Sequence, residues 1–346
     1  MDQPLVTVFI PLYNCEEYIS EALESVINQT YSNIEVVIVD DGSTDNSVNI
    51  VNSYTDPRIR LIKNEINRGI PYTRNLGLEK SQGKYMAIMD SDDIAYLTRI
   101  EKQVNYMENN SNIDGIGTYY EIFGGRFKKV MRPKNITSEE IKAGLLFLNR
   151  IANPTSFLRL ETINKYELRY NPEYFVAQDY DMWIQLSKVG ELSILPEVLL
   201  KYRTGHTNVT KKSKSSKIIQ RKKINDSIHR DILDFYNFDL TEVELRVFNE
   251  FFNDNYQSEI SDSTLDHLPR LLTKMVEQNR HNKLFKEELF SEIIRDTVLV
   301  VLNRRKINLS RKLRVYNEVC KVKSVRSITR DLSYMVPKHI YNFLLL

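Results

Sequence analysis

The sequence predicts an α/β fold, in which a mainly parallel sheet lies between helices and a mostly α-helical C-terminal region follows. Short apolar runs alternate with segments of helical periodicity over the first ninety residues. Acidic clusters come directly after two of those runs, where buried parallel strands end. Beyond about residue 210 the strand signal disappears and Gly and Pro become rare.

The first part of the chain alternates between the two periodicities. Apolar runs predict strands at 5–10, 34–39, 58–62 and 85–89. Helical spacing predicts helices between them, at 16–29, 44–54 and 70–80. A strand that returns through a helix pairs in parallel with the strand before it, so this order predicts a parallel sheet between helical layers.

The pattern is looser after Arg99. Helices are expected at 99–109 and 176–189, and a strand at 192–203 that Pro196 breaks. Residues 115–132 combine glycines with aromatic and β-branched residues, which predicts antiparallel strands or a hairpin.

The character of the sequence changes at Lys211. Residues 211–223 hold seven Lys/Arg and no acid. Helical patterns follow at about 217–236, 241–253, 265–279, 284–304 and 310–320. We therefore expect two domains, at 1–210 and 211–346, the second ending in a basic tail at 302–346.

Composition limits the class of protein. The net charge of the 346 residues is +2, but the tail holds eleven Lys/Arg and two acids. Two cysteines far apart make no disulfide framework, which favours a reducing cytoplasm. The first residues do not predict a signal peptide, and we expect no membrane span because no apolar run approaches about 20 residues. We expect a cytoplasmic protein, peripheral at most at the inner face of the cell membrane.

The acidic clusters predict the chemistry. Carboxylates crowded at a strand tip, as in the run from Met89 to Asp93, repel one another unless a cation sits between them. The simplest occupant is Mg²⁺ or Mn²⁺ carrying a diphosphate. The sequence thus predicts an enzyme that handles a nucleoside diphosphate.

Five segments together resemble family 2 glycosyltransferases. They read VTVFIPLYN, VDDGSTD, NRG followed by RNLG, GKYMAIMDSDD and QDYDMW, at 6–14, 39–45, 67–77, 83–93 and 178–183. The resemblance covers roughly residues 4–210. It implies the GT-A fold and an inverting transfer from a nucleoside diphosphate sugar, with UDP as the expected nucleotide.

The resemblance implies a role for each matching residue of the donor site. Pro11 and Tyr13 would line the base and ribose pocket. Asp41 would accept a hydrogen bond from the base, and Arg74 would approach the nucleotide or its diphosphate.

It also implies a metal site and a catalytic base. Asp90 would face the ribose or the sugar, with Ser91 beside it among the donor-binding residues; the expected metal ligands are Asp92 and His206. Asp179 would be the base, and Asp181 is its rival. The family often has Glu-Asp where this chain has Gln178 and Asp179.

The predicted function is transfer of a hexose-type sugar to a saccharide hydroxyl, on a lipid-linked acceptor in cell-surface polysaccharide synthesis. A catalytically silent sugar-nucleotide-binding module and a sugar nucleotidyltransferase are the alternatives. The helical region could be a plain helical domain, a dock for anionic lipid through its tail, or a surface for an oligomer or partner enzyme. No nucleic-acid recognition motif is present, and no nucleic-acid partner is expected.

Overall fold

The computed structural model describes residues 3–125, 128–134, 136–205, 217–256 and 260–320. The chain forms two compact units. The sheet unit comprises 1–142 and 149–212, and the helical unit comprises 143–148 and 213–346. No sequence pattern indicated that 143–148 belong with the helical unit.

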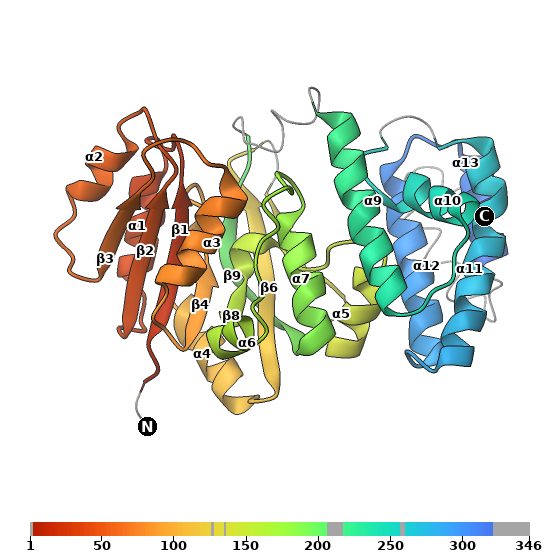
Figure 1. The fold of residues 1–346 in the computed structure, drawn as a ribbon, viewed down its shortest axis with the longest axis horizontal. Helices are drawn as coiled ribbons and strands as arrows, with labels where there is room; N and C mark the ends of the chain where they lie inside the picture. The colour runs from red at the N-terminus through yellow and green to blue at the C-terminus, as the bar shows by residue number, and fades with distance from the viewer. Residues whose placement is uncertain (1–2, 126–127, 135, 206–216, 257–259, 321–346) are drawn as a thin grey trace, which may run out of the picture. The chain divides into compact units, whose positions relative to one another are not determined.

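In the part of the chain that the structure describes, nine strands form one sheet. Its order is β3-β2-β1-β4-β8-β6-β9-β5, and β7 pairs with β6 (Figure 1). The strands are β1 Val6–Leu12, β2 Ile34–Asp40, β3 Ile59–Lys63, β4 Tyr85–Ile88, β5 Ile94–Ala95, β6 Ile113–Phe123, β7 Lys129–Met131, β8 Phe157–Arg159 and β9 Glu191–Arg203.

Helices connect and cover the strands. In the sheet unit they are α1 Ile19–Ile27, α2 Ser47–Asn52, α3 Ile70–Lys80, α4 Arg99–Asn109, the 3-10 helix η1 Asn153–Thr155, α6 Leu160–Lys165 and α7 Gln178–Val189. Helix α5, Ser138–Leu145, runs into the segment 143–148. In the helical unit they are α9 Ile218–Phe235, α10 Glu242–Phe252, α11 Asp262–Asn282, α12 Glu287–Arg304 and α13 Leu309–Cys320.

The first half of the sheet is parallel, as the alternating pattern predicts. Strand β1 lies between β2 and β4 and is parallel to both. All seven of its residues are buried, because helices such as α3 cover the sheet. Parallel pairing brings the carboxyl ends of β1, β2 and β4 to one edge of the sheet, and this edge carries the site described below.

The second half is mixed, and one sequence expectation is wrong there. β6 and β7 form the expected antiparallel pair, but the long partner of β6 is β9, which is parallel to it. Pro196 does not break β9: the register passes from Leu195 to Val198 between Thr118 and Tyr119. The proline therefore lies in a bulge, where its missing N–H costs no ladder hydrogen bond.

The helical unit has an aromatic core. Phe147 packs against Phe248, Phe252 and Phe290, with ring centroids 4.9 to 6.2 Å apart. Its carbonyl also bonds Nε2 of the buried His229 at 3.2 Å. The segment 143–148 is thus anchored within this unit. None of the helices in the described ranges is long and apolar enough to span a bilayer.

Candidate active site

The loop after β1 presents the first expected donor residues. Pro11 is the sixth residue of β1 and is buried opposite Val39 of β2. Tyr13 follows the strand and is 46% exposed. A large aromatic ring exposed at the carboxyl edge of a parallel sheet is available to a planar ligand.

Asp41 organises the neighbouring loop. Its carboxylate accepts hydrogen bonds from Asn64 Nδ2 and from the backbone N–H groups of Arg68 and Gly69, at 2.8 to 2.9 Å. The loop also passes so close to Gly42, at φ 75°, that a Cβ there would lie 2.9 Å from backbone atoms. Asp41 therefore fixes the loop 64–69, and its contact with a base stays a prediction.

The acidic loop at 90–93 follows β4 and is fixed by its backbone. The N–H of Asp93 donates to the carbonyl of Asp90 at 3.2 Å, which closes a turn. The thiol of Cys15 donates to the carbonyl of Ser91 at 3.5 Å, and burial raises the pKa of that thiol to about 11. The expected metal ligand Asp92 lies in the middle of this turn.

Arg203, at the end of β9, hydrogen-bonds to the same loop, and no role was predicted for it from the sequence. Its Nε donates to the carbonyl of Asp92 at 2.7 Å, and its backbone N–H donates to Asp93 Oδ1 at 2.8 Å. The guanidinium lies over the rings of Tyr18 and Phe123, at 4.7 and 4.5 Å. The one sequence signal was its place three residues before His206.

Two carboxyl groups of this loop have raised pKa values, as expected where negative charges are crowded. Burial, with Asp92 and Asp179 nearby, raises the pKa of Asp90 to about 6, against the lowering effect of Arg74. Burial, then Asp90 and Asp92, raises the pKa of Asp93 well above its ordinary value. Asp93 Oδ2 is buried and has no hydrogen-bond partner among the residues that the structure describes. Such a cluster favours a bound cation.

Two arginines supply positive charge from the protein. Arg74 is buried on α3, with Nη2 3.8 Å from Asp90 Oδ1 and its guanidinium 5.4 Å from the Tyr170 ring centroid. Arg99 is fully buried on α4, where Nη2 donates to the carbonyl of Ile88 at 2.9 Å. Burial lowers the pKa of Arg99 to about 10. Arg74 thus belongs to the carboxylate cluster.

Asp179 lies in the first turn of α7 and acts electrostatically on the same cluster, since it raises the pKa of Asp90. Its Oδ2 accepts a hydrogen bond from Asn149 Nδ2 at 2.8 Å. The rival Asp181 is buried, and its Oδ2 accepts from Gln185 Nε2 at 2.7 Å. The structure therefore brings Asp179 together with Asp90 and Arg74 and gives Asp181 a partner on its own helix.

Two further residues complete the outcome of the sequence predictions. Trp183, the last residue of the QDYDMW segment, is 2% exposed and belongs to the core. His206 lies outside the described residues, so its expected role as a metal ligand stays a prediction.

The donor set suits a hard divalent cation. In the described ranges no three His, Cys, Asp or Glu side chains converge into a closed metal site. Mg²⁺ and similar ions are commonly held by one or two carboxylates together with waters and substrate phosphates. The crowded carboxylates of 90–93 and the unpartnered Asp93 Oδ2 fit such an open site.

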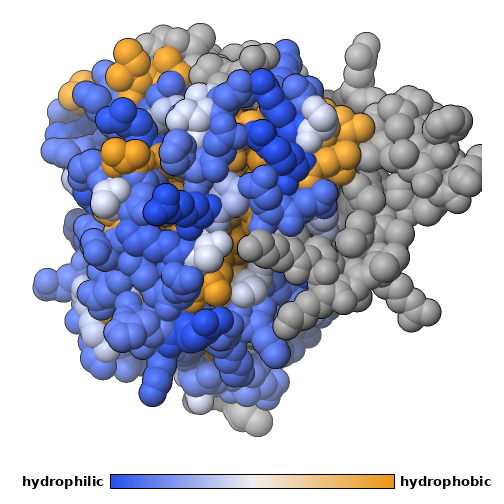
Figure 2. Space-filling view, turned by 90° about the vertical axis from the view of Figure 1, so that its right-hand side faces the viewer, coloured by the Kyte–Doolittle hydropathy of each residue, from blue (hydrophilic) through white to orange (hydrophobic). Residues whose placement is uncertain are grey.

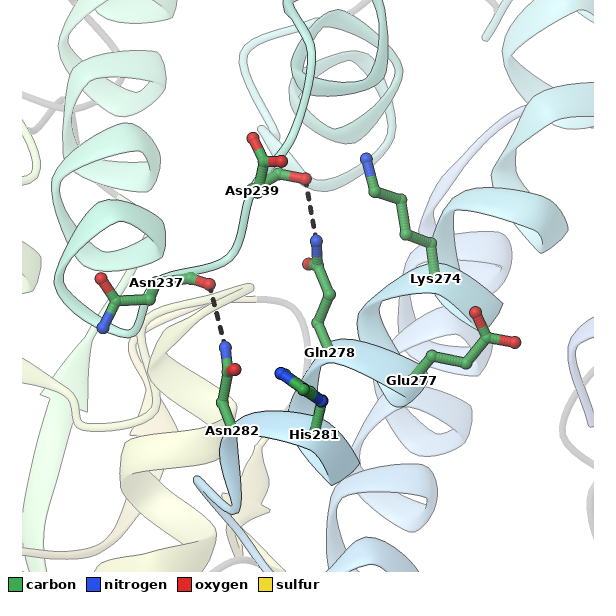
Figure 3. Close-up of a pocket in the computed structure, with 7 residues that line it drawn as sticks. All are labelled: Asn237, Asp239, Lys274, Glu277, Gln278, His281 and Asn282. Atoms are coloured by element: carbon green, nitrogen blue, oxygen red, sulfur yellow. Dashed lines mark hydrogen bonds between the residues drawn. The ribbon is translucent and has the colours of Figure 1, made fainter.

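A separate depression of about 520 Å³ lies wholly within the helical unit. It is lined by Asn237, Asp239, Lys274, Glu277, Gln278, His281 and Asn282 (Figure 3). Two amides in it donate to backbone carbonyls, Gln278 to that of Asp239 and Asn282 to that of Asn237. It contains no residue of the carboxylate cluster.

The basic tail is described only as far as residue 320. Its arginines there largely meet acidic partners: Arg304 pairs with Asp254, Arg311 with Asp262 and Arg314 with Asp266. These ion pairs reduce the positive charge available to an anionic lipid, and tail docking stays a prediction. Figure 2 shows a mainly hydrophilic face with small, separate hydrophobic groups.

Comparison with known proteins identifies the family. Residues 7–166 match the family model described as Glycosyl transferase family 2. Over 242 residues the chain is 30% identical to WfaP of Escherichia coli, a UDP-Glc:alpha-D-GlcNAc-diphosphoundecaprenol beta-1,3-glucosyltransferase. That match covers 67% of this chain and 92% of WfaP.

Two solved structures share the fold. TarS of S. aureus, residues 1–349 in complex with UDP-GlcNAc, matches with a TM-score of 0.59 and 19% identity, over 95% of this chain and 91% of that chain. The mannosyltransferase PcManGT of Pyrobaculum calidifontis, in complex with GDP-Man and Mn²⁺, matches with a TM-score of 0.50 and 16% identity, over 99% and 88%. At these identities the likeness shows the fold alone.

Proposed function

The chain belongs to glycosyl transferase family 2, and on that premise we propose that it is a metal-dependent, inverting hexosyltransferase. One observation carries the proposal. Asp92 and Asp179 both raise the pKa of Asp90, which follows β4 at the carboxyl edge of the parallel strands, and Arg74 Nη2 lies 3.8 Å from the Asp90 carboxylate. Such a cluster provides both a place for a cation with a diphosphate and a separate base.

The donor we propose is a UDP-hexose. WfaP is named for UDP-Glc and the TarS structure holds UDP-GlcNAc, which supports uracil as the base. We assign Pro11, Tyr13 and Asp41 to the nucleoside, and Arg74, Asp90 and Ser91 to the ribose, diphosphate or sugar. These six residues lie in β1, in the loops that follow β1, β2 and β4, and in α3, and all belong to the sheet unit.

The proposed cofactor is Mn²⁺ or Mg²⁺. Asp92 would hold it, with His206 as a second ligand. When bound, the ion supplies charge stabilisation for the leaving diphosphate. The Mn²⁺ in the PcManGT structure supports this choice.

Inversion follows from what the side chains would do in the transfer. The acceptor oxygen attacks the anomeric carbon on the face opposite the diphosphate, and the bond between that carbon and the phosphate oxygen breaks. Asp179 takes the proton of the acceptor hydroxyl as the new bond forms. Arg74 contributes positive charge on the side where the leaving group gains negative charge.

The acceptor we propose is a saccharide carried on a lipid diphosphate, as in the name of WfaP. Such an acceptor would place the reaction at the cytoplasmic face of the cell membrane, with the protein peripheral to it. We assign catalysis to residues 1–210 and an accessory role to the helical residues 211–346, whose tail at 302–346 would approach anionic lipid.

The test is release of UDP by the purified protein from a panel of UDP-sugars, with Mn²⁺ and with EDTA. We expect release from one donor that EDTA abolishes, and proton NMR of the product should show the anomeric configuration inverted. Release that persists in EDTA would contradict the metal, and a retained configuration would contradict the single displacement.

A further inference from the structure

Asn149 contacts the proposed base with a defined orientation. Its Nδ2 donates to Asp179 Oδ2 at 2.8 Å, while its Oδ1 accepts the backbone N–H of Ile151 at 3.1 Å. A backbone N–H can only donate, so Oδ1 must be the atom that faces Ile151. The amide NH₂ therefore faces the carboxylate, and the contact is a hydrogen bond to a charged group.

The hydrogen bond from Asn149 occupies one of the two carboxylate oxygens of Asp179 and leaves the other available to a substrate. Among the residues that the structure describes, the side chain that donates to Asp179 is that of Asn149, and it takes Oδ2. Asn149 is exposed and Asp179 is half-buried, so the pair lies where a substrate can reach it. Oδ1 is then the oxygen that can accept an acceptor proton.

The backbone that follows Asn149 is held within the sheet unit. Asn153, four residues later, begins the buried turn η1. A side chain that must hold a reacting group within a fraction of an ångström needs this kind of support.

We propose that Asn149 is a positioning residue, which turns the Asp179 carboxylate so that Oδ1 meets the acceptor hydroxyl. This rests on the proposed function, because it needs Asp179 to be the base. A base misplaced by about 1 Å loses much of its effect, since proton transfer requires hydrogen-bond reach in the reacting complex.

Two substitutions at the same position separate positioning from a structural role. Asn149→Asp keeps an oxygen for the Ile151 N–H but replaces the donor with a like charge beside Asp179. Asn149→Ala removes both contacts and adds no charge. Positioning therefore predicts that Asn149→Asp is the more damaging change, whereas a purely structural role predicts the reverse.

The measurement is steady-state transfer from UDP-sugar with Mn²⁺, together with UDP affinity by calorimetry. We expect kcat to fall about tenfold in Asn149→Ala and about a hundredfold in Asn149→Asp, the range of one hydrogen bond to a charged group. KM for the donor and the affinity for UDP should stay unchanged, because Asn149 contacts the base and not the donor residues.

Asp179→Asn, measured in parallel, separates the two ways of failing. The positioning role would be overturned by wild-type kcat in both Asn149 variants, or by a smaller loss in Asn149→Asp than in Asn149→Ala. If Asp179→Asn is inactive in the same experiment, the assignment of Asp179 as the base still stands. A fully active Asp179→Asn would overturn the base, and the positioning role with it.

Discussion

The sheet unit gathers like charges at one edge of its sheet, whereas the helical unit pairs opposite charges along its helices. Asp90 and Asp93 have raised pKa values because burial and neighbouring carboxylates oppose their ionisation. In the helical unit, Arg311 pairs with Asp262 and Lys274 with Glu244. The first arrangement costs stability and suits a bound cation; the second is ordinary surface stabilisation.

The largest contrast is expected from removing one acid in each unit. Asp92→Ala should lower turnover about a thousandfold, because an ion that stabilises the leaving group is worth several kcal/mol. Asp262→Ala, on α11, should leave turnover unchanged. UDP release with Mn²⁺ measures the turnover of both variants. Equal losses of turnover would contradict the assignment of catalysis to the sheet unit alone.

The second contrast is between aromatic side chains of the helical unit. Phe147→Ala should lower the free energy of unfolding by about 3–5 kcal/mol, since a fully buried ring leaves a cavity. Phe235→Ala, at an exposed ring on α9, is the matched control, with an expected loss of about 1 kcal/mol or less. Chemical denaturation followed by circular dichroism measures both, and similar losses would contradict an aromatic core around Phe147.

The third expected effect is a pH dependence of stability at the sheet edge. The folded-state pKa of Asp90, about 6, lies above the ordinary 3.8, so the folded protein holds this proton more tightly. The stability that the bound proton of Asp90 contributes is fully present below about pH 4 and is lost as the pH rises through about 6. Asp90→Asn should therefore stabilise the metal-free protein at pH 8 by about 1–2 kcal/mol, reduced by partial exposure.

Thermal unfolding in EDTA at pH 8 and at pH 4.5 checks this. The gain should be large at the higher pH and small at the lower one. Asp266→Asn, in the helical unit, should show no such gain. Destabilisation by Asp90→Asn at both pH values would mean that its carboxylate is satisfied within the protein.

The smallest expected effect concerns the ion pairs of the described tail. A double-mutant cycle on Arg314 and Asp266, both about half exposed, should give a coupling of about 0.2–1 kcal/mol that fades in high salt. A coupling above about 2 kcal/mol, insensitive to salt, would show that this pair is not an ordinary surface pair.

Local patterns predicted the parts of this molecule that depend on neighbours in sequence. Apolar runs located β1, β2 and β4, and the acids that follow them lie at the expected edge. Contacts between distant residues left no local pattern. Arg203 donates a hydrogen bond to Asp93, 110 residues away in sequence, and Asn149 donates one to Asp179, 30 residues away. The prediction that Pro196 breaks the strand at 192–203 was wrong for the same reason, because a bulge depends on the partner strand.

The assignment of segments to units shows the same limit. The residues 143–148 read as part of the first domain, because nothing in their own sequence reports what they pack against. Their partners, such as Phe248 and Phe290, lie about a hundred residues or more further along the chain. Only the folded chain reveals that association.

The central claim is that the carboxylate edge of the sheet unit is the catalytic site, with Asp179 as its base. Turnover and UDP affinity of Asp179→Asn and Asp181→Asn, each beside Asp92→Ala, test it most directly. We predict that Asp179→Asn loses about 10²- to 10⁴-fold in kcat with UDP affinity unchanged, and that Asp181→Asn keeps its turnover. Turnover near the wild-type value in Asp179→Asn, while Asp92→Ala is inactive, would contradict the claim.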